Sequence, residues 1–258
     1  MQKKTQITIA IVGKGGVGKT TMSGIIINRL IKHNCEPILV VDADPNTGLD
    51  TALGIKVDKT VGGIREETRT IVKNGTVVNI SKQELLEIKI AESLVEAEKF
   101  DFIAMGRPEG PGCYCYANSV LKSTLGKISH EYPYIVIDNE AGLENLSRRL
   151  SNEVNLLILV SDPSKQGMRT IERLYALTHE MGIKYNQLGL IINRLRNSDH
   201  SDEILNLKSK IQADYLIEIQ DNLEIIQLSE AGKDLLHLPE NNEVLKSIDL
   251  FLSSAGLF

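Results

Sequence analysis

The chain has 258 residues, of which 42% are hydrophobic and 24% charged, a composition typical of a soluble globular protein. Its net charge of −5, its 4% of aromatic residues and its lack of tryptophan argue against nucleic acid or an anionic membrane as a partner. Residues 1–6 are polar, and the apolar run that follows is too short for a membrane span and lacks the features of a signal peptide. We therefore expect a cytoplasmic protein.

Short apolar runs alternate with segments of helical spacing along most of the chain. Strands are predicted at 7–12, 37–42, 100–105, 133–138, 155–161 and 188–193, with a weaker one at 214–219. Helices are predicted at 19–33, 82–98, 116–130, 165–181 and 200–211, and the C-terminal residues 244–254 are typical of a helix packed on the core. The pattern predicts a single α/β domain over residues 1–258, with a central, mostly parallel sheet flanked by helices on both faces.

A glycine-rich loop follows the first predicted strand and opens the first predicted helix. It matches G-x-x-x-x-G-K-[ST], the phosphate-binding P-loop of nucleoside triphosphatases. Its backbone N–H groups are expected to wrap the phosphates, Lys19 to reach the β- and γ-phosphates, and the Thr20 hydroxyl to ligate Mg²⁺. The predicted phosphate-binding residues are Gly13, Gly15, Gly16, Val17, Gly18, Lys19, Thr20 and Thr21.

Lys14 is a second lysine in this loop. The run Gly-Lys-Gly-Gly-Val-Gly-Lys-Thr-Thr resembles the deviant Walker A motif of the superfamily that includes MinD, ParA, ArsA and the nitrogenase iron protein. The resemblance implies an ATPase that acts as a homodimer. In such a dimer Lys14 would cross the interface and neutralise charge on the partner's nucleotide, in the manner of an arginine finger. A solvated loop lysine is the alternative.

Acidic residues follow two apolar strands, at the carboxyl edge where open α/β sheets bind ligands. By the same resemblance, Asp42 and Asp44 belong to switch I, with Asp44 orienting the attacking water and Asp42 near the magnesium ion. Asp138 resembles the Walker B aspartate and would hold Mg²⁺ through water, and Gly142 would let switch II approach the γ-phosphate. A helix or turn cap is the alternative role for each aspartate. The predicted catalytic residues are Lys14, Lys19 and Asp44.

Asn193 and Arg194 end the strand predicted at 188–193. The amide of Asn193 offers both a donor and an acceptor to an adenine edge, and it falls where the superfamily has an asparagine for the base. An asparagine that merely favours a turn is the alternative. The chain has no Asn/Thr-Lys-x-Asp guanine motif, which favours ATP and ADP as ligands. By resemblance, the loop around Pro239 is expected to close over the base.

Cys113 and Cys115 lie one residue apart after Gly-Pro-Gly. A disulfide across one residue would be strained, whereas a looped backbone lets both thiols face one metal ion. A complete soft site usually needs four ligands, so one chain offers half a site and a twofold dimer completes it. Four thiolates suit Ni²⁺ or Zn²⁺, and two cysteines without a ligand are the alternative.

Residues 105–118, Met-Gly-Arg-Pro-Glu-Gly-Pro-Gly-Cys-Tyr-Cys-Tyr-Ala-Asn, resemble the CooC-type nickel-insertion ATPases of carbon monoxide dehydrogenase and the accessory ATPase of acetyl-CoA synthase. Together with residues 138–144, this resemblance extends over essentially the whole chain. It implies a nickel metallochaperone that serves one of these apo-enzymes. Asn145 stands where a histidine is expected, and Cys35 is expected to be an inert buried thiol.

Two other functions use the same nucleotide motifs. A MinD- or ParA-like positioning ATPase needs a basic tail or surface, whereas the C-terminal helical segment carries only Lys246. An iron–sulfur donor like the nitrogenase iron protein uses two cysteines per subunit that are far apart in sequence, and Cys35 is in the wrong place for one of them. The positioning ATPase is the main alternative.

Overall fold

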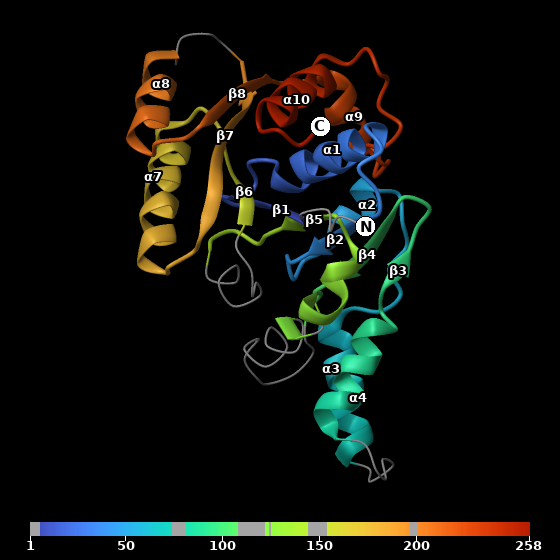
Figure 1. The fold of residues 1–258 in the computed structure, drawn as a ribbon. Helices are drawn as coiled ribbons and strands as arrows, with labels where there is room; N and C mark the ends of the chain where they lie inside the picture. Colours follow the sequence, from blue (N-terminus) through green and yellow to red (C-terminus); the bar gives the residue numbers. More distant parts are fainter. Residues whose placement is uncertain (1–5, 74–80, 108–121, 124, 144–153, 197–200) are drawn as a thin grey trace, which may run out of the picture.

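The computed structural model describes residues 6–73, 81–107, 122–123, 125–143, 154–196 and 201–258. Within these residues, eight strands form one sheet in the order β3-β4-β2-β5-β1-β6-β7-β8 (Figure 1). Neighbouring strands are parallel except β3 and β4. The strands are β1 Ile7–Gly13, β2 Ile38–Asp42, β3 Val95–Glu96, β4 Phe100–Ala104, β5 Tyr134–Asp138, β6 Val154–Ser161, β7 Tyr185–Leu195 and β8 Tyr215–Gln220.

Helices cover both faces of this sheet, so the predicted α/β fold class is confirmed (Figure 1). Along β1, Ile9 and Ile11 pack in the core shared with α1 and α10, while Ala10 and Val12 face the core shared with α7 and α8. The helices are α1 Lys19–Lys32, α2 Leu49–Ala52, α3 Val61–Lys73, α4 Lys82–Ala91, α7 Lys165–Glu180, α8 Ser201–Lys210, α9 Leu223–Glu230 and α10 Glu243–Ser254, with a short 3₁₀ turn at Ser129–Glu131.

The helix predicted over 82–98 is wrong in its second half. α4 ends at Ala91, where the Ser93 hydroxyl donates to the Ile90 carbonyl and occupies one of the acceptors that end a helix. The chain then forms the β3–β4 hairpin, closed by the Ala97 N–H, which donates to the Phe100 carbonyl at 2.9 Å. One apolar pattern thus spans two elements.

Three helices of the structure, α2, α3 and α9, are absent from the prediction. Of the helix predicted over 116–130, residues 116–121 and 124 lie outside the described residues. α3 and α4 pack together and extend from the end of the sheet that holds β3 and β4 (Figure 1). The Lys89 ammonium pairs with the Glu67 carboxylate at 2.7 Å between them. None of the described helices is long and apolar enough to cross a lipid bilayer.

Candidate active site

The glycine-rich loop leaves the centre of the sheet, because β1 lies between β5 and β6. A Cβ on Gly13 would lie 2.3 Å from the Val160 carbonyl oxygen of β6, so a side chain does not fit there. Gly18 has a φ of 94°, and a Cβ there would lie 2.5 Å from Nδ2 of Asn193. These two positions require glycine, and they determine the path of the loop between its neighbouring strands.

The amino end of α1 faces this loop without a side-chain cap. Its N-cap residue is Gly18, which has no side chain that could cap the helix, and the first turn of the helix holds no acidic residue. The free N–H groups of that turn and the positive end of the helix dipole are therefore directed at the loop. This arrangement is suited to binding a phosphate group.

Lys19 is the buried cation of the site. Its side chain turns back along the loop, and Nζ donates to the Lys14 carbonyl oxygen at 3.2 Å. Burial lowers the pKa of Lys19, while the negative charges of Asp138, Asp44 and Glu140 act in the opposite direction. The ammonium has therefore lost much of its hydration before a nucleotide arrives, which strengthens its attraction for a phosphate.

Asp138 ends β5 and is only 1% exposed. Its carboxylate accepts hydrogen bonds from the Thr20 hydroxyl at 2.7 Å and from the Ser23 hydroxyl at 3.0 Å, both on α1. Burial raises the pKa of Asp138 to about 6, against the lowering effect of these hydroxyls and of Lys19. The structure thus places the P-loop threonine and the predicted Walker B aspartate in direct contact.

Asp42 lies beside Asp138 on the neighbouring strand, because β2 and β5 pair these two residues in register. Burial, followed by the charge of Asp138, raises the pKa of Asp42 to about 7. Its carboxylate accepts hydrogen bonds from the backbone N–H groups of Asp44 at 3.1 Å and of Gly48 and Leu49 at 3.2 Å each. Asp42 therefore shapes the loop after β2 and the start of α2, which is the capping role that the sequence left open as an alternative.

The donors at this edge fit a magnesium ion. Carboxylate and hydroxyl oxygens are its preferred protein ligands, and Thr20 and Asp138 would hold it, directly or through water. Two buried carboxylates on adjacent strands with raised pKa values are stabilised as anions when a divalent cation is close. The ion would supply positive charge to the β- and γ-phosphates. The place of Asp42 near the ion stays a prediction.

Two further residues that are predicted to belong to the switch segments, Asp44 and Gly142, lie near the phosphate loop. Asp44 is half-buried, and its Oδ1 accepts hydrogen bonds from the backbone N–H of Asn46 at 2.8 Å and from its side-chain amide at 3.0 Å. Gly142 has a φ of 109°, a conformation that favours glycine. A Cβ on Gly15 would lie 4.0 Å from the Ala141 side chain, so this segment runs beside the P-loop. The catalytic roles of Lys14 and Asp44 stay predictions.

A cavity of about 230 Å³ opens on the other side of the P-loop, between α1, the end of β7 and the start of α9. Among the predicted residues, Gly18, Thr21, Asn193 and Arg194 line it. Nδ2 of Asn193 donates to the Val17 carbonyl at 2.9 Å, which leaves the amide oxygen available for a donor such as the adenine amine.

The wall of this cavity opposite Asn193 was not predicted. It is formed by the loop between β8 and α9, with Gln220, Asp221 and Asn222 lining the cavity. Asp221 accepts a hydrogen bond from Nε of Arg196 at 2.7 Å, which ties this loop to the end of β7. The sequence did predict a weak strand at 214–219, which corresponds to β8. Only the strand order of the structure shows that β8 lies next to β7, so that the loops after both strands meet at this cavity.

Replacing Asn193 with alanine is expected to weaken ATP binding by about two- to tenfold, because the base and the Val17 carbonyl each lose a hydrogen-bond partner. Titration with ATP, followed by calorimetry, measures the change. Asn186→Ala is the matched control, since Asn186 is exposed at the opposite end of β7. Equal ATP affinities for Asn193→Ala and the control would contradict the assignment of this cavity to the base.

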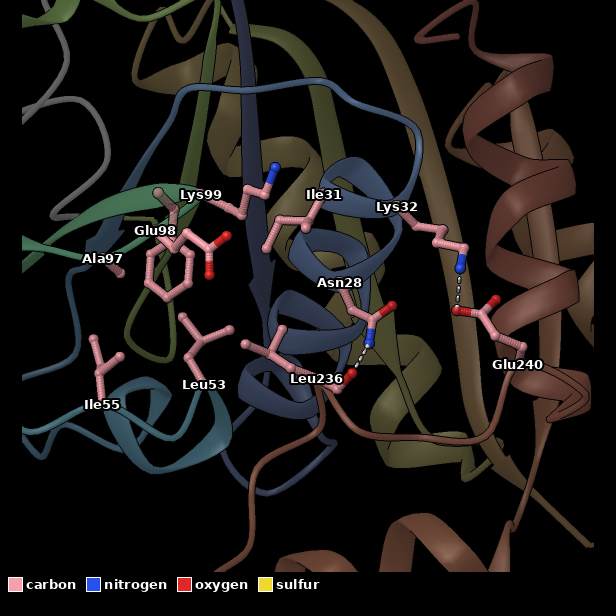
Figure 2. A pocket seen from close by; sticks show the side chains of 11 residues that line it. Asn28, Ile31, Lys32, Leu53, Ile55, Ala97, Glu98, Lys99, Leu236 and Glu240 are labelled. Atoms are coloured by element: carbon pink, nitrogen blue, oxygen red, sulfur yellow. Dashed lines mark hydrogen bonds and ion pairs between the residues drawn. The ribbon is translucent and has the colours of Figure 1, made fainter.

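Pro239 does not line this cavity. The next residue, Glu240, pairs with Arg29 at 3.0 Å and with Lys32 at 3.2 Å, in the half of α1 that lies farthest from the P-loop. A second cavity of about 320 Å³ opens there, beside the hydrogen bond from Asn28 to the Leu236 carbonyl (Figure 2). The ion pairs hold the loop at that end of the helix, and the contact of Pro239 with the base stays a prediction.

The predicted soft-metal ligands, Cys113 and Cys115, lie outside the described residues, as does Asn145. Within the described part of the chain, no group of three or more histidine, cysteine, aspartate or glutamate side chains is placed to hold a metal ion. Cys35 is buried, with its Sγ 4.0 Å from the Leu257 carbonyl oxygen, in the setting expected of an unreactive thiol.

Comparisons with known proteins agree with this geometry. A family model described as an AAA domain matches residues 5–191. An uncharacterised ATP-binding protein of Methanocaldococcus jannaschii is 39% identical, over 93% of this chain and 95% of that protein. The carbon monoxide dehydrogenase accessory protein CooC of Rhodospirillum rubrum is 28% identical, over 89% of this chain and 93% of that protein. The structure of the septum site-determining protein MinD from Pyrococcus horikoshii with Mg-ADP matches with a TM-score of 0.67 and 19% identity, over 97% and 95%.

Fold and site define a P-loop ATPase, as predicted. The chain belongs to the AAA domain family, whose model matches residues 5–191. At 19% identity, the MinD structure supports the fold alone.

Proposed function

We propose that this protein is an ATP-driven metallochaperone, a single domain of residues 1–258 that acts as a homodimer in the cytoplasm. Cys113 and Cys115 of each protomer together hold one Ni²⁺ or Zn²⁺ as cargo. The receiving protein is apo carbon monoxide dehydrogenase or apo acetyl-CoA synthase. The 28% identity to CooC of Rhodospirillum rubrum and the Cys-Tyr-Cys segment support this proposal.

The proposal depends most on the position of the end of β4, which lies beside Asp42. β4 lies next to β2, and Ala104 at its end pairs with Asp42 in register. The chain that continues from β4 leads to Cys113 and Cys115. The end of β4, after which the chain continues toward the two cysteines, therefore lies beside the loop of Asp42 and Asp44.

In this proposal, ATP binding joins two protomers and hydrolysis separates them. Lys19 and Thr20 bind phosphate and Mg²⁺, Asp44 orients the water, and Lys14 acts on the nucleotide of the partner. Metal affinity then differs between nucleotide states only as far as the metal prefers one arrangement of the dimer.

Metal-free protein is expected to bind about one Ni²⁺ or Zn²⁺ per dimer, because two pairs of thiolates complete a four-ligand site. The Cys113→Ala/Cys115→Ala variant is expected to lose this binding, measured by titration with Zn²⁺ and with Ni²⁺ while the oligomeric state is followed. Cys35→Ala is the matched control, since Cys35 is a buried thiol. Undiminished metal binding by the double variant would refute the proposal.

The positioning ATPase remains the alternative. It needs a basic amphipathic anchor, and α10 does not resemble one: it buries Leu245, Ile248 and Leu252 against the core and carries Lys246 among acidic neighbours. Binding to anionic vesicles or to DNA at physiological salt, together with failure of the metal titration, would favour the alternative.

A further inference from the structure

We propose that the second cavity, beside the carboxyl half of α1, is a binding site for a small organic cation with an apolar body and one protonated amine. The volume of this cavity, about 320 Å³, lies at the lower end of the range for small-molecule sites. The cavity is at the opposite end of α1 from the P-loop, so the site is separate from that of the nucleotide. The proposal is independent of the metal-binding function proposed above.

Apolar side chains from four segments form most of the cavity wall. The segments are the last turns of α1, the chain after α2, the β3–β4 hairpin and the loop after α9 (Figure 2). A ligand gains most of its binding free energy here by removing an apolar body from water. The apolar lining residues are Ile31, Leu53, Ile55, Ala97, Phe100 and Leu236.

Hydrogen bonds hold the walls of the cavity in place. Nδ2 of Asn28 on α1 donates to the carbonyls of Leu235 at 3.0 Å and Leu236 at 3.1 Å. The Leu235 N–H donates in turn to the carbonyl of Ala52, the last residue of α2, at 2.8 Å. The loop after α9 is thus attached to two helices. The cavity is therefore formed before a ligand arrives, which lowers the free-energy cost of binding.

Asn28 offers a buried acceptor to a ligand. The residue is 7% exposed and lines the cavity. Its two N–H groups are used by the two backbone carbonyls, which fixes the orientation of the amide. Its Oδ1 has no hydrogen-bond partner among the described residues, and Figure 2 shows this oxygen on the side of the amide away from the Leu236 carbonyl. An N–H of a ligand would satisfy this acceptor.

The charges at the rim select a cation. Lys32 pairs with Glu240 at 3.2 Å. Lys99 pairs with Glu36 at 2.8 Å. Glu98 is exposed and acts electrostatically on Lys99, but it makes no hydrogen bond or ion pair within the described part of the chain. Figure 2 shows its carboxylate directed toward the apolar side chains. The uncompensated charge at the opening is therefore negative and complements a protonated amine.

The test uses three probes that share an indole ring and a two-carbon arm. Tryptamine ends in an ammonium, tryptophol in a hydroxyl and indolepropionate in a carboxylate. The chain has no tryptophan, so a change in indole fluorescence reports binding directly. Tryptamine is expected to bind saturably with a dissociation constant below about 1 mM. Tryptophol should bind about two- to fivefold more weakly, because it lacks the charge that faces an exposed carboxylate, and indolepropionate more weakly still.

Glu98→Gln is expected to weaken tryptamine binding by about two- to fivefold and to leave tryptophol binding unchanged. Glu96→Gln is the matched control, since Glu96 is exposed in the same hairpin but is not among the lining residues. Equal tryptamine affinities for the two variants would overturn the assignment of a cationic ligand. Ala97→Phe fills the cavity and should abolish the binding of both probes, with circular dichroism to establish that the variant is folded.

A non-hydrolysable ATP analogue with Mg²⁺ tests whether the site is separate. At saturation it should not displace tryptamine, because the cavity of Asn193 and this one lie at opposite ends of α1. Displacement would place the indole in the nucleotide site and overturn the proposal. Tryptamine binding that Ala97→Phe leaves unchanged, or no saturable binding below about 1 mM, would overturn it as well.

Discussion

Lys19→Ala is expected to lower the rate of ATP hydrolysis by about 10²- to 10⁴-fold, because it removes the buried positive charge from the phosphate loop. The ammonium is already desolvated and lies among Asp138, Asp44 and Glu140, so its removal leaves their negative charges without their buried counter-charge. Steady-state phosphate release at saturating ATP and Mg²⁺ measures the loss. Circular dichroism establishes whether the variant is folded.

Lys32→Ala is the control for this experiment. Lys32 lies on the last turn of the same helix, is exposed, and pairs with Glu240 instead of facing the loop. Its replacement removes an equal charge from α1 and should leave turnover unchanged. Turnover by Lys19→Ala close to that of the control would show that this lysine does not act on the nucleotide.

Asp138→Asn is expected to change activity and stability in opposite directions. Turnover should fall by about 10²-fold or more, because the magnesium ion loses the charge of its buried carboxylate. Without nucleotide or Mg²⁺ at pH 8, the free energy of unfolding should rise by about 2–3 kcal/mol, because the variant no longer buries an anion in the folded state. The Thr20 and Ser23 hydroxyls rotate and keep hydrogen bonds to the amide.

The pH dependence of stability gives this prediction a second readout. The pKa of Asp138 rises from 3.8 to about 6 and that of Asp42 from 3.8 to about 7, so the folded protein binds more protons than the unfolded chain between these values. The contribution of these two carboxyl groups to the free energy of unfolding is therefore highest near pH 4 and falls as the pH rises to about 7. In Asp138→Asn the fall should be smaller.

Urea unfolding of the nucleotide-free and magnesium-free protein at several pH values measures both effects. Asp58→Asn is the control, since Asp58 is exposed and pairs with Lys56 at the surface. A lower stability of Asp138→Asn than of the control at pH 8 would contradict a destabilising buried carboxylate. Retained turnover would contradict its role at the magnesium ion.

Features that consecutive residues form could be predicted from the sequence, whereas contacts between distant segments could not. The P-loop could be predicted because consecutive residues carry it: Gly13 to Thr21 lie between a strand and a helix, and the local backbone places them. The strands could be predicted for the same reason, because burial on both faces makes them continuously apolar. The error over 82–98 arose where one apolar pattern crosses a helix and a hairpin.

Contacts between residues that are far apart in the chain could not be predicted from the sequence. Asp42 and Asp138 are far apart in the chain, and the effect of Asp138 on the pKa of Asp42 follows from the pairing of β2 with β5. The hydrogen bond from the Asn193 amide to the Val17 carbonyl also joins distant parts of the chain, and it forms because β7 ends near the phosphate loop. The position of Glu240, next to Pro239, likewise follows from an ion pair with Arg29 that the sequence does not reveal.

The sequence by itself determined the class of protein, a P-loop ATPase with an α/β fold, since short-range motifs and burial patterns are written in consecutive residues. It also identified the cysteine pair as a candidate soft-metal ligand. Only the tertiary structure decided that two acidic strand ends share one desolvated edge. Strand order brings these residues together, and strand order depends on long-range packing that no local pattern specifies.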